Sequence, residues 1–314
     1  MTSRSVLLVG AGVIGHRHMQ AATRFGDHIS AVVDGDRARA DAAASQYGAA
    51  AFSTLTEALA ASPVDVIVIA TPSPQHHAQA IEALANGADV LVEKPHRVPG
   101  DSADELAAAV ADASGRYVIG MTTRHWPGVR AAASAVANGD LGTVLSYSDR
   151  MHFTLAPDAL PAWYFVRESA GGGVLLTNGV HAIDRARALL GSDLTVVASR
   201  LVTVFADHEV EDSAELRLVS GDGVPVDLSM LWSPADAFAT GVTITGTAGF
   251  AHVEMDGSWV VKTTSSHTHG GPVSDQQPFD LQWDSFSRAE SGFGFDELEP
   301  SIALIEQCYR ESAS

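Results

Sequence analysis

Short apolar runs alternate with alanine-rich stretches over the first 120 residues. The runs are continuous in valine, leucine and isoleucine, which is typical of strands buried on both faces of a parallel sheet. The stretches between them read as helices that cover such a sheet. The predicted strands are 5–12, 28–34, 64–70, 88–94 and 116–122, and the predicted helices are 13–26, 37–47, 54–61, 75–86 and 101–113.

The pattern changes after about residue 121. Apolar and polar residues then alternate along several segments, which indicates an antiparallel sheet with one covered face. Helices are predicted at 127–138, about 172–190 and 296–312, strands at 142–153, 195–206, 212–220, 225–233, 241–249 and 250–257, and a polar loop at 264–278. The 314 residues therefore divide into an α/β domain at 1–121 and an α+β domain at 122–314, whose open sheet is mostly antiparallel.

Composition narrows the class of protein. The formal net charge of −19 repels phosphate backbones, so we expect no binding to nucleic acid. Cys308 is the only cysteine, so no internal disulfide can form. No run of about 20 apolar residues is present, which predicts no membrane span. A cytoplasmic protein is the expectation.

A glycine-rich turn joins the first predicted strand to the first predicted helix. Gly10, Gly12 and Gly15 stand in G-x-G-x-x-G spacing. Gly10 permits the tight turn, Gly12 lets the backbone approach a pyrophosphate, and Gly15 lets the helix pack closely on the strand. The helix start at Val13 and Ile14 offers free N–H groups to phosphates. The motif predicts a Rossmann domain with a dinucleotide site.

The acidic residue expected on the adenosine ribose is Asp34, at the end of the second strand. Its carboxylate would accept from the ribose 2′-hydroxyl and repel a 2′-phosphate, which favours NAD. Arg37 and Arg39 follow closely and suit a 2′-phosphate, so NADP stays open. Thr71 and Pro72, after the third strand above, are expected to wall the cofactor, and the adjoining His76 to reach its diphosphate or nicotinamide ribose.

The chain contains only two lysines, Lys94 and Lys262. Lys94 follows Glu93 at the end of a predicted buried strand, where the nicotinamide of a bound dinucleotide is expected, so both join the cofactor-binding candidates. Burial and a nearby positive charge can lower the pKa of a lysine, whereas arginine stays protonated. Lys94 is therefore the predicted acid/base group or cationic clamp on a reacting hydroxyl. Lys262 is expected on a surface strand.

A second polar cluster lies in the helix predicted at 172–190. Thr177, His181 and Asp184 fall at i, i+4 and i+7 and so share one face, with Asn178 beside it. A histidine near a carboxylate and uncharged polar groups is typical of an acid/base or substrate-binding site. A structural histidine is the alternative.

These features together resemble the Gfo/Idh/MocA oxidoreductase family. The similarity rests on "GAGVIG", "ATPSPQHHAQAIEALANGADVLVEKP", "GGGVLLTNGVHAIDRARALLG" and "VTITGTAGF". The resemblance implies hydride transfer at a secondary alcohol or ketone of a sugar, inositol or related polyol. It also implies that Lys94 and His181 are catalytic, that Asp184 binds substrate, and that the second sheet forms a homo-dimer or homo-tetramer interface.

One position departs from the family pattern, because Thr177 stands where members often carry aspartate. The substrate could therefore be a non-sugar diol, ketone or imine, and a non-catalytic dinucleotide-binding regulator is a further alternative. Arg124 and Trp163 join Lys94, Thr177, Asn178, His181 and Asp184 as predicted substrate contacts. His125, Tyr164 and Arg167 also lie near these positions in the sequence. No metal site is predicted, since His267 and His269 lack a third ligand.

Overall fold

A computed structural model describes residues 3–155, 161–205, 208–233 and 240–312. The chain forms two compact units. Unit 1 comprises Met1–Thr122 and Asp275–Glu299, and unit 2 comprises Thr123–Ser274 and Pro300–Ser314. None of the described helices is both long and apolar enough to span a membrane.

The apolar runs of unit 1 form a six-stranded, all-parallel sheet with the order β3-β2-β1-β4-β5-β6. Every residue of the central strand β4 (Val66–Ile69) is buried, as expected for a sheet that is covered on both faces. The other strands are β1 (Ser5–Val9), β2 (His28–Val33), β3 (Ala50–Phe52), β5 (Asp89–Glu93) and β6 (Tyr117–Gly120). β3 was not predicted.

Side-chain caps mark the starts of three helices of unit 1. Ser102 caps α5 by accepting from the amide of Glu105, and Asp36 caps α2 by accepting from two amides of its first turn. The helices are α1 (Val13–Arg24), α2 (Arg37–Tyr47), α3 (Leu55–Ala61), α4 (His76–Leu84) and α5 (Ala103–Asp112), with a 3₁₀ turn η1 (Ser73–Gln75) before α4.

Unit 1 also contains the helix α9 (Gln277–Ser287). This helix was not predicted, and its residues lie in the range that the sequence assigns to the second domain. Its Trp283 is fully buried in the core of unit 1, and the indole Nε1 donates to Asp27 at 2.9 Å. Burial of this aromatic ring explains why the chain returns to the first unit at this point.

Unit 2 is built on an eight-stranded sheet with the order β14-β13-β12-β11-β7-β10-β9-β8. Its neighbouring strands are antiparallel except for the parallel pair β10 and β7, so the predicted fold class is confirmed. The strands are β7 (Val144–Thr154), β8 (Leu194–Val202), β9 (Ser213–Ser220), β10 (Pro225–Ser233), β11 (Gly241–Gly246), β12 (Gly249–Val253), β13 (Trp259–Thr263) and β14 (His267–Gly270). β14 lies within the predicted polar loop, and β13 is the surface strand expected at Lys262, although its bounds were not predicted.

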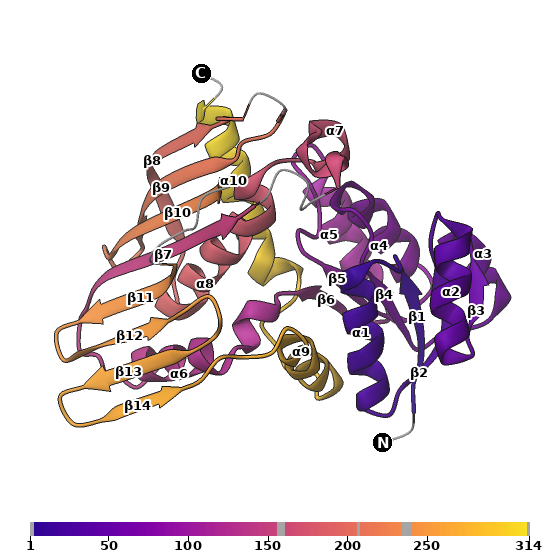
Figure 1. Ribbon diagram of the computed structural model, residues 1–314, viewed down its shortest axis with the longest axis horizontal. Helices are drawn as coiled ribbons and strands as arrows, with labels where there is room; N and C mark the ends of the chain where they lie inside the picture. The colour runs from indigo at the N-terminus through magenta and orange to yellow at the C-terminus, as the bar shows by residue number, and fades with distance from the viewer. Residues whose placement is uncertain (1–2, 156–160, 206–207, 234–239, 313–314) are drawn as a thin grey trace. The chain divides into compact units, whose positions relative to one another are not determined.

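Helices pack on one face of this sheet, and Figure 1 shows α6 and α8 beside its strands. Along β10, alternate residues point to the covered face and are buried. The helical elements of unit 2 are η2 (a 3₁₀ turn whose range, Thr122–His125, begins at the last residue of unit 1), α6 (Pro127–Ala137), η3 (Ala162–Phe165), α7 (Arg167–Ala170), the π-helical turn η4 (Leu175–Gly179) and α8 (Val180–Leu190). The last helix, α10 (Phe295–Ser312), contains Pro300 and belongs to unit 1 before that residue and to unit 2 from it onward.

Candidate functional site

The glycine-rich turn between β1 and α1 has the geometry of a phosphate cradle. Gly10 has a positive φ of +97°, and a Cβ atom there would lie 2.6 Å from the carbonyl of Ala70. A Cβ atom on Gly15 would lie 2.0 Å from the carbonyl oxygen of Gly10. Gly12, which precedes the helix, has open space around its Cα. The three glycines therefore have the geometry that the motif predicts for the tight turn, the approach of a pyrophosphate and the close packing of the helix on the strand.

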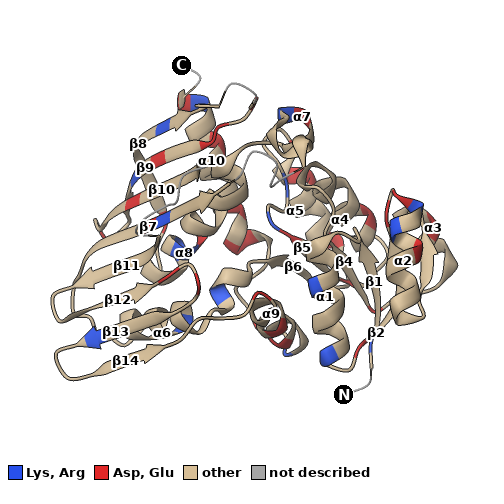
Figure 2. Cartoon of the chain, viewed as in Figure 1, with Lys and Arg blue, Asp and Glu red and all other residues tan. Residues whose placement is uncertain are grey.

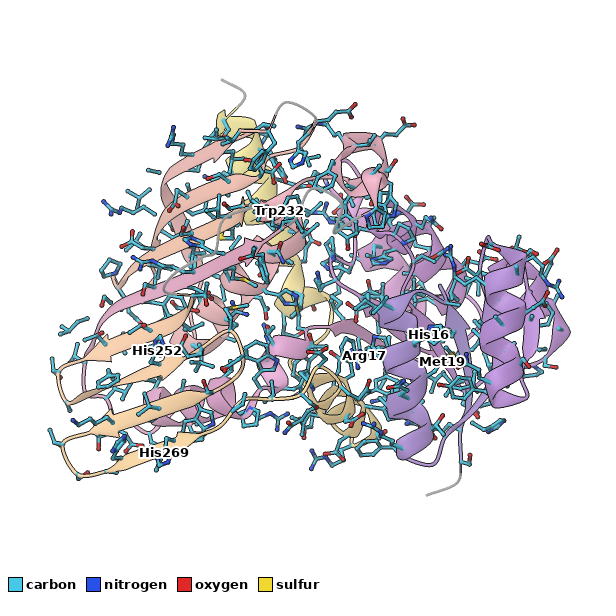
Figure 3. The ribbon with its side chains drawn as sticks, in the orientation of Figure 1. His16, Arg17, Met19, Trp232, His252 and His269 are labelled. Atoms are coloured by element: carbon cyan, nitrogen blue, oxygen red, sulfur yellow. The ribbon has the colours of Figure 1, made fainter. Side chains whose placement is uncertain are left out.

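The start of α1 is unusually apolar and exposed. Val13 is 76% exposed and Ile14 is 41% exposed, although both side chains are hydrophobic. Beside them lies a cavity of about 590 Å³. Its lining residues are Ala11, Gly12, Val13, His16, Arg17, Gln20 and Arg39, of which Figure 3 labels His16 and Arg17. A dinucleotide would cover this surface and meet the free N–H groups of the helix.

Asp34 lies directly after β2 and is buried beside the cradle. Its Oδ2 accepts from the amide of Ala11 and its Oδ1 from the amide of Asp36, both at 2.9 Å. Nη1 of Arg39 lies 3.4 Å from both carboxylate oxygens. Arg37 instead donates to Asp41 at 2.9 Å on the exposed side of α2. Of the two arginines that suited a 2′-phosphate, only Arg39 lines the cavity.

His76 is 1% exposed and is held by two main-chain carbonyls. Its Nδ1 lies 2.7 Å from the carbonyl oxygen of Pro95, and its Nε2 lies 2.7 Å from that of Thr71. Burial lowers the pKa of His76, although the two contacts with main-chain carbonyls act to raise it. His76 therefore links the end of β4 to the loop after Lys94, and its contact with the diphosphate or the nicotinamide ribose stays a prediction. Thr71 and Pro72 are partly exposed at the end of β4. The Thr71 hydroxyl donates to Oε1 of Gln79.

Lys94 follows the last residue of β5 and is partly exposed. Burial lowers the pKa of its ammonium, and the charge of Glu93 opposes that shift without cancelling it. The Glu93 carboxylate is buried, with Oε2 accepting from the amide of Lys94 at 3.2 Å and Oε1 from Nε2 of His18 at 2.8 Å. A lysine with a lowered pKa is the kind of group that proton transfer at an alcohol requires.

The residues after Lys94 form a buried ion-pair cluster that the sequence did not predict. Glu299 accepts from Nε2 of His96 and from Nε of Arg97, both at 2.9 Å, and from a further guanidinium nitrogen of Arg97. His96 and Arg97 are both buried. The cluster ties the loop that carries Lys94 to the first turns of α10 within unit 1.

In unit 2, the predicted polar helix begins with the π-helical turn η4, a feature that occurs often at functional sites. Thr177 lies on this turn and its hydroxyl donates to the carbonyl of Gly173 at 2.8 Å. Asn178 accepts at Oδ1 from the indole Nε1 of Trp232 at 2.9 Å. Trp232, labelled in Figure 3, was not predicted as part of the site.

His181 and Asp184 both contact the turn η2. Nδ1 of His181 lies 3.4 Å from the hydroxyl of Thr123. Asp184 accepts from Nε of Arg124 at 2.6 Å and also from its Nη2. Asp184 is 0% exposed and its carboxylate holds Arg124 in place, while its contact with substrate stays a prediction.

The remaining candidates of unit 2 lie apart from this cluster or have other partners. The half-buried Trp163 packs on Tyr164 with ring centroids 4.2 Å apart. Arg167 donates to the carbonyl of Glu209 at 2.8 Å. The rings of His267 and His269 lie 5.8 Å apart on β14, and no group of three or more potential metal ligands occurs in the described part of the chain.

Comparison with known proteins places this chain in a family. Residues 4–121 match the profile described as "Oxidoreductase family, NAD-binding Rossmann fold", and residues 129–252 match the "GFO/IDH/MocA C-terminal domain". The rhizopine catabolism protein MocA of Rhizobium meliloti is 31% identical over 81% of this chain and 80% of its own length. The chain belongs to the Gfo/Idh/MocA oxidoreductase family. The resemblance inferred from the motifs is thereby confirmed, and the cofactor of unit 1 is NAD.

Individual Gfo/Idh/MocA proteins differ in how much of their length this chain matches. An inositol 2-dehydrogenase of Leifsonia xyli is 35% identical over 60% of this chain, but the match spans only 54% of the relative. The crystal structure of GenD2 from gentamicin A biosynthesis, in complex with NAD, superposes with a TM-score of 0.85. It is 26% identical, and the match covers all of this chain and 95% of GenD2.

Proposed function

We propose that this protein transfers a hydride between NAD and a secondary alcohol or ketone of a sugar, inositol or related polyol. The observation that carries the proposal is the position of Lys94, which is partly exposed at the carboxyl end of a strand in an NAD-binding unit. Burial lowers the pKa of its ammonium group. Ligands of such sheets bind at the carboxyl ends of the strands. The similarity to an inositol 2-dehydrogenase supports a polyol as the substrate class.

Each candidate residue has a proposed role. Bound nicotinamide supplies or accepts the hydride. Lys94 binds the reacting oxygen and exchanges its proton, since a titratable amine can do both whereas an arginine cannot. His181 acts as a second acid/base group or orients the substrate. Asn178, fixed by Trp232, and Arg124, fixed by Asp184, bind substrate hydroxyls.

A second candidate keeps the cofactor chemistry but changes the substrate to a non-sugar diol, ketone or imine. Thr177, where relatives often carry an aspartate, favours this alternative. Its hydroxyl donates to the carbonyl of Gly173, so this position offers no negative charge to a substrate. A polyol with several hydroxyl donors gains less at such a position than at a carboxylate.

We further propose a homo-dimer or homo-tetramer through the outer face of the second sheet. No described helix covers that face, and Figure 2 shows acidic and basic residues along the strands of this sheet. A cavity of about 470 Å³ on this face is lined by Arg150, Arg200, Arg217, Glu215 and Asp227, among others. Interspersed charges favour pairing with a second copy of the same face. The cytoplasmic location stays a prediction.

The proposed function is tested by incubating the protein with NAD⁺ and a panel of cyclic polyols, aldoses and simple diols, following NADH absorbance. The reverse reaction is followed with NADH and matching ketones and imines. We expect turnover with at least one polyol. Turnover of only non-sugar substrates supports the second candidate, and NADH binding without turnover of any substrate overturns both.

A further inference from the structure

A buried histidine on the cofactor-binding helix reaches the residue next to Lys94. His18 lies on α1, is fully enclosed, and donates from Nε2 to Oε1 of Glu93 at 2.8 Å. Its ring edge packs against Phe279 of α9, with centroids 5.1 Å apart. The Nδ1 atom has no hydrogen-bond partner among the described residues. Nε2 is therefore the ring atom that His18 presents to the Glu93 carboxylate.

The Glu93 carboxylate fits a narrow slot that the sequence keeps open. A Cβ atom on Gly120 of β6 would lie 3.0 Å from Oε1 of Glu93. The carboxylate is therefore enclosed by β6 on one side and by His18 on another, while Oε2 accepts from the amide of Lys94. Such an enclosed side chain has little freedom to reorient.

The charged groups around this carboxylate act on one another. Burial by itself raises the pKa of Glu93, but the hydrogen bond from His18 and the electrostatic interactions with His18, Lys94 and His76 lower it overall. Glu93 in turn raises the pKa of Lys94 against the larger effect of burial. Glu93 raises and Lys94 lowers the pKa of His76, in which burial dominates.

We propose that His18 is a positioning residue for hydride transfer, because its hydrogen bond holds the Glu93 carboxylate beside Lys94 and thereby controls proton exchange at Lys94. The catalytic meaning of this role rests on the function proposed above. The coupling itself concerns only residues of unit 1.

Loss of the hydrogen bond from His18 should change the pKa values of Glu93 and Lys94 in a defined direction. Without it, burial dominates at Glu93 and the pKa of Glu93 rises, so less negative charge stands next to Lys94. The pKa of Lys94 then falls further below the ordinary lysine value. Oxidation of an alcohol, which uses the neutral amine, would extend to lower pH.

The test uses the fact that the chain has only two lysines. Reductive ¹³C-methylation of the whole chain gives one NMR signal for each lysine side chain and one for the α-amino group, and the two lysine signals are assigned with Lys94→Arg and Lys262→Arg. The Lys94 signal is titrated with pH in the wild type, His18→Leu, His18→Gln and Glu93→Gln. His77→Gln is the matched control, since His77 is also buried in unit 1 but bonds the carbonyl of Ser102 instead.

We expect the Lys94 midpoint to move to lower pH in Glu93→Gln, less far in His18→Leu, and least in His18→Gln, whose amide restores a donor. His77→Gln should leave it in place, and the exposed Lys262 serves as an internal reference. A Lys94 midpoint that is the same in His18→Leu as in the wild type would overturn the inference. Because this titration needs no substrate, its failure is distinct from a failure to find turnover.

Discussion

Replacement of Asp34 with serine should invert the cofactor preference. The Asp34 carboxylate accepts from the amides of Ala11 and Asp36 and still has lone pairs for a ribose hydroxyl. A hydrogen bond to a charged acceptor contributes about 1.5 to 3 kcal/mol. Its loss should weaken NADH binding about 10- to 150-fold.

The same substitution should strengthen NADPH binding. A 2′-phosphate brings close to two negative charges near the carboxylate. Each like-charge pair at about 4 Å costs about 1 kcal/mol in water, so relief of both gives about 30-fold. The ratio of NADH to NADPH affinity should therefore change by about 300- to 4,500-fold.

Titration of nicotinamide fluorescence with both cofactors measures this change. Within the Asp34→Ser background, Arg39→Ala should weaken NADPH binding and leave NADH binding nearly unchanged, because Arg39 lines the cavity. Arg37→Ala is the matched control, since Arg37 pairs with Asp41. If Asp34→Ser weakens NADH and NADPH equally, the carboxylate acts by holding the turn and not by reading the ribose.

Three further predictions concern single groups. Gly15→Ala should abolish NADH binding in the same titration, because the added Cβ would lie 2.0 Å from the Gly10 carbonyl oxygen. Retained NADH affinity would contradict the assignment of this turn as the phosphate-binding site. Asp184→Asn leaves Arg124 without its buried charge partner and should lower the free energy of unfolding by about 3 kcal/mol, as measured by urea denaturation. A loss below about 1 kcal/mol would show that the pair is not structural. Burial raises the pKa of Cys308 to about 11, so a thiol reagent at pH 8 should label it only after unfolding, and rapid labelling of the native protein would refute its enclosure.

The regular elements of the fold were predictable where a local pattern determines them. The buried runs and the glycine motif located five of the six strands of the first sheet. β3 has only three residues, too few to show a strand pattern, so its strand state comes from pairing with β2. Helix α9 mixes proline, aspartate and glutamine with aromatic residues, and its stability comes from burial of Trp283 in unit 1.

The candidate site was predictable in its motif residues but not in their partners. His18 and Glu93 are 75 residues apart, and Arg97 and Glu299 are 202 apart, so no local spacing links them. The assumption of regular α-helical spacing was also wrong at Thr177, because the π-helical turn η4 changes the register before His181. Such long-range contacts and local irregularities depend on tertiary packing.

The central claim is that Lys94 supplies a titratable amine for hydride transfer. The most direct test measures turnover of a polyol with NAD⁺, together with NADH affinity, in the wild type and in Lys94→Arg. Arginine keeps the positive charge but cannot release its proton at ordinary pH. The account predicts NADH affinity close to that of the wild type with turnover lost. Undiminished turnover in Lys94→Arg would contradict it.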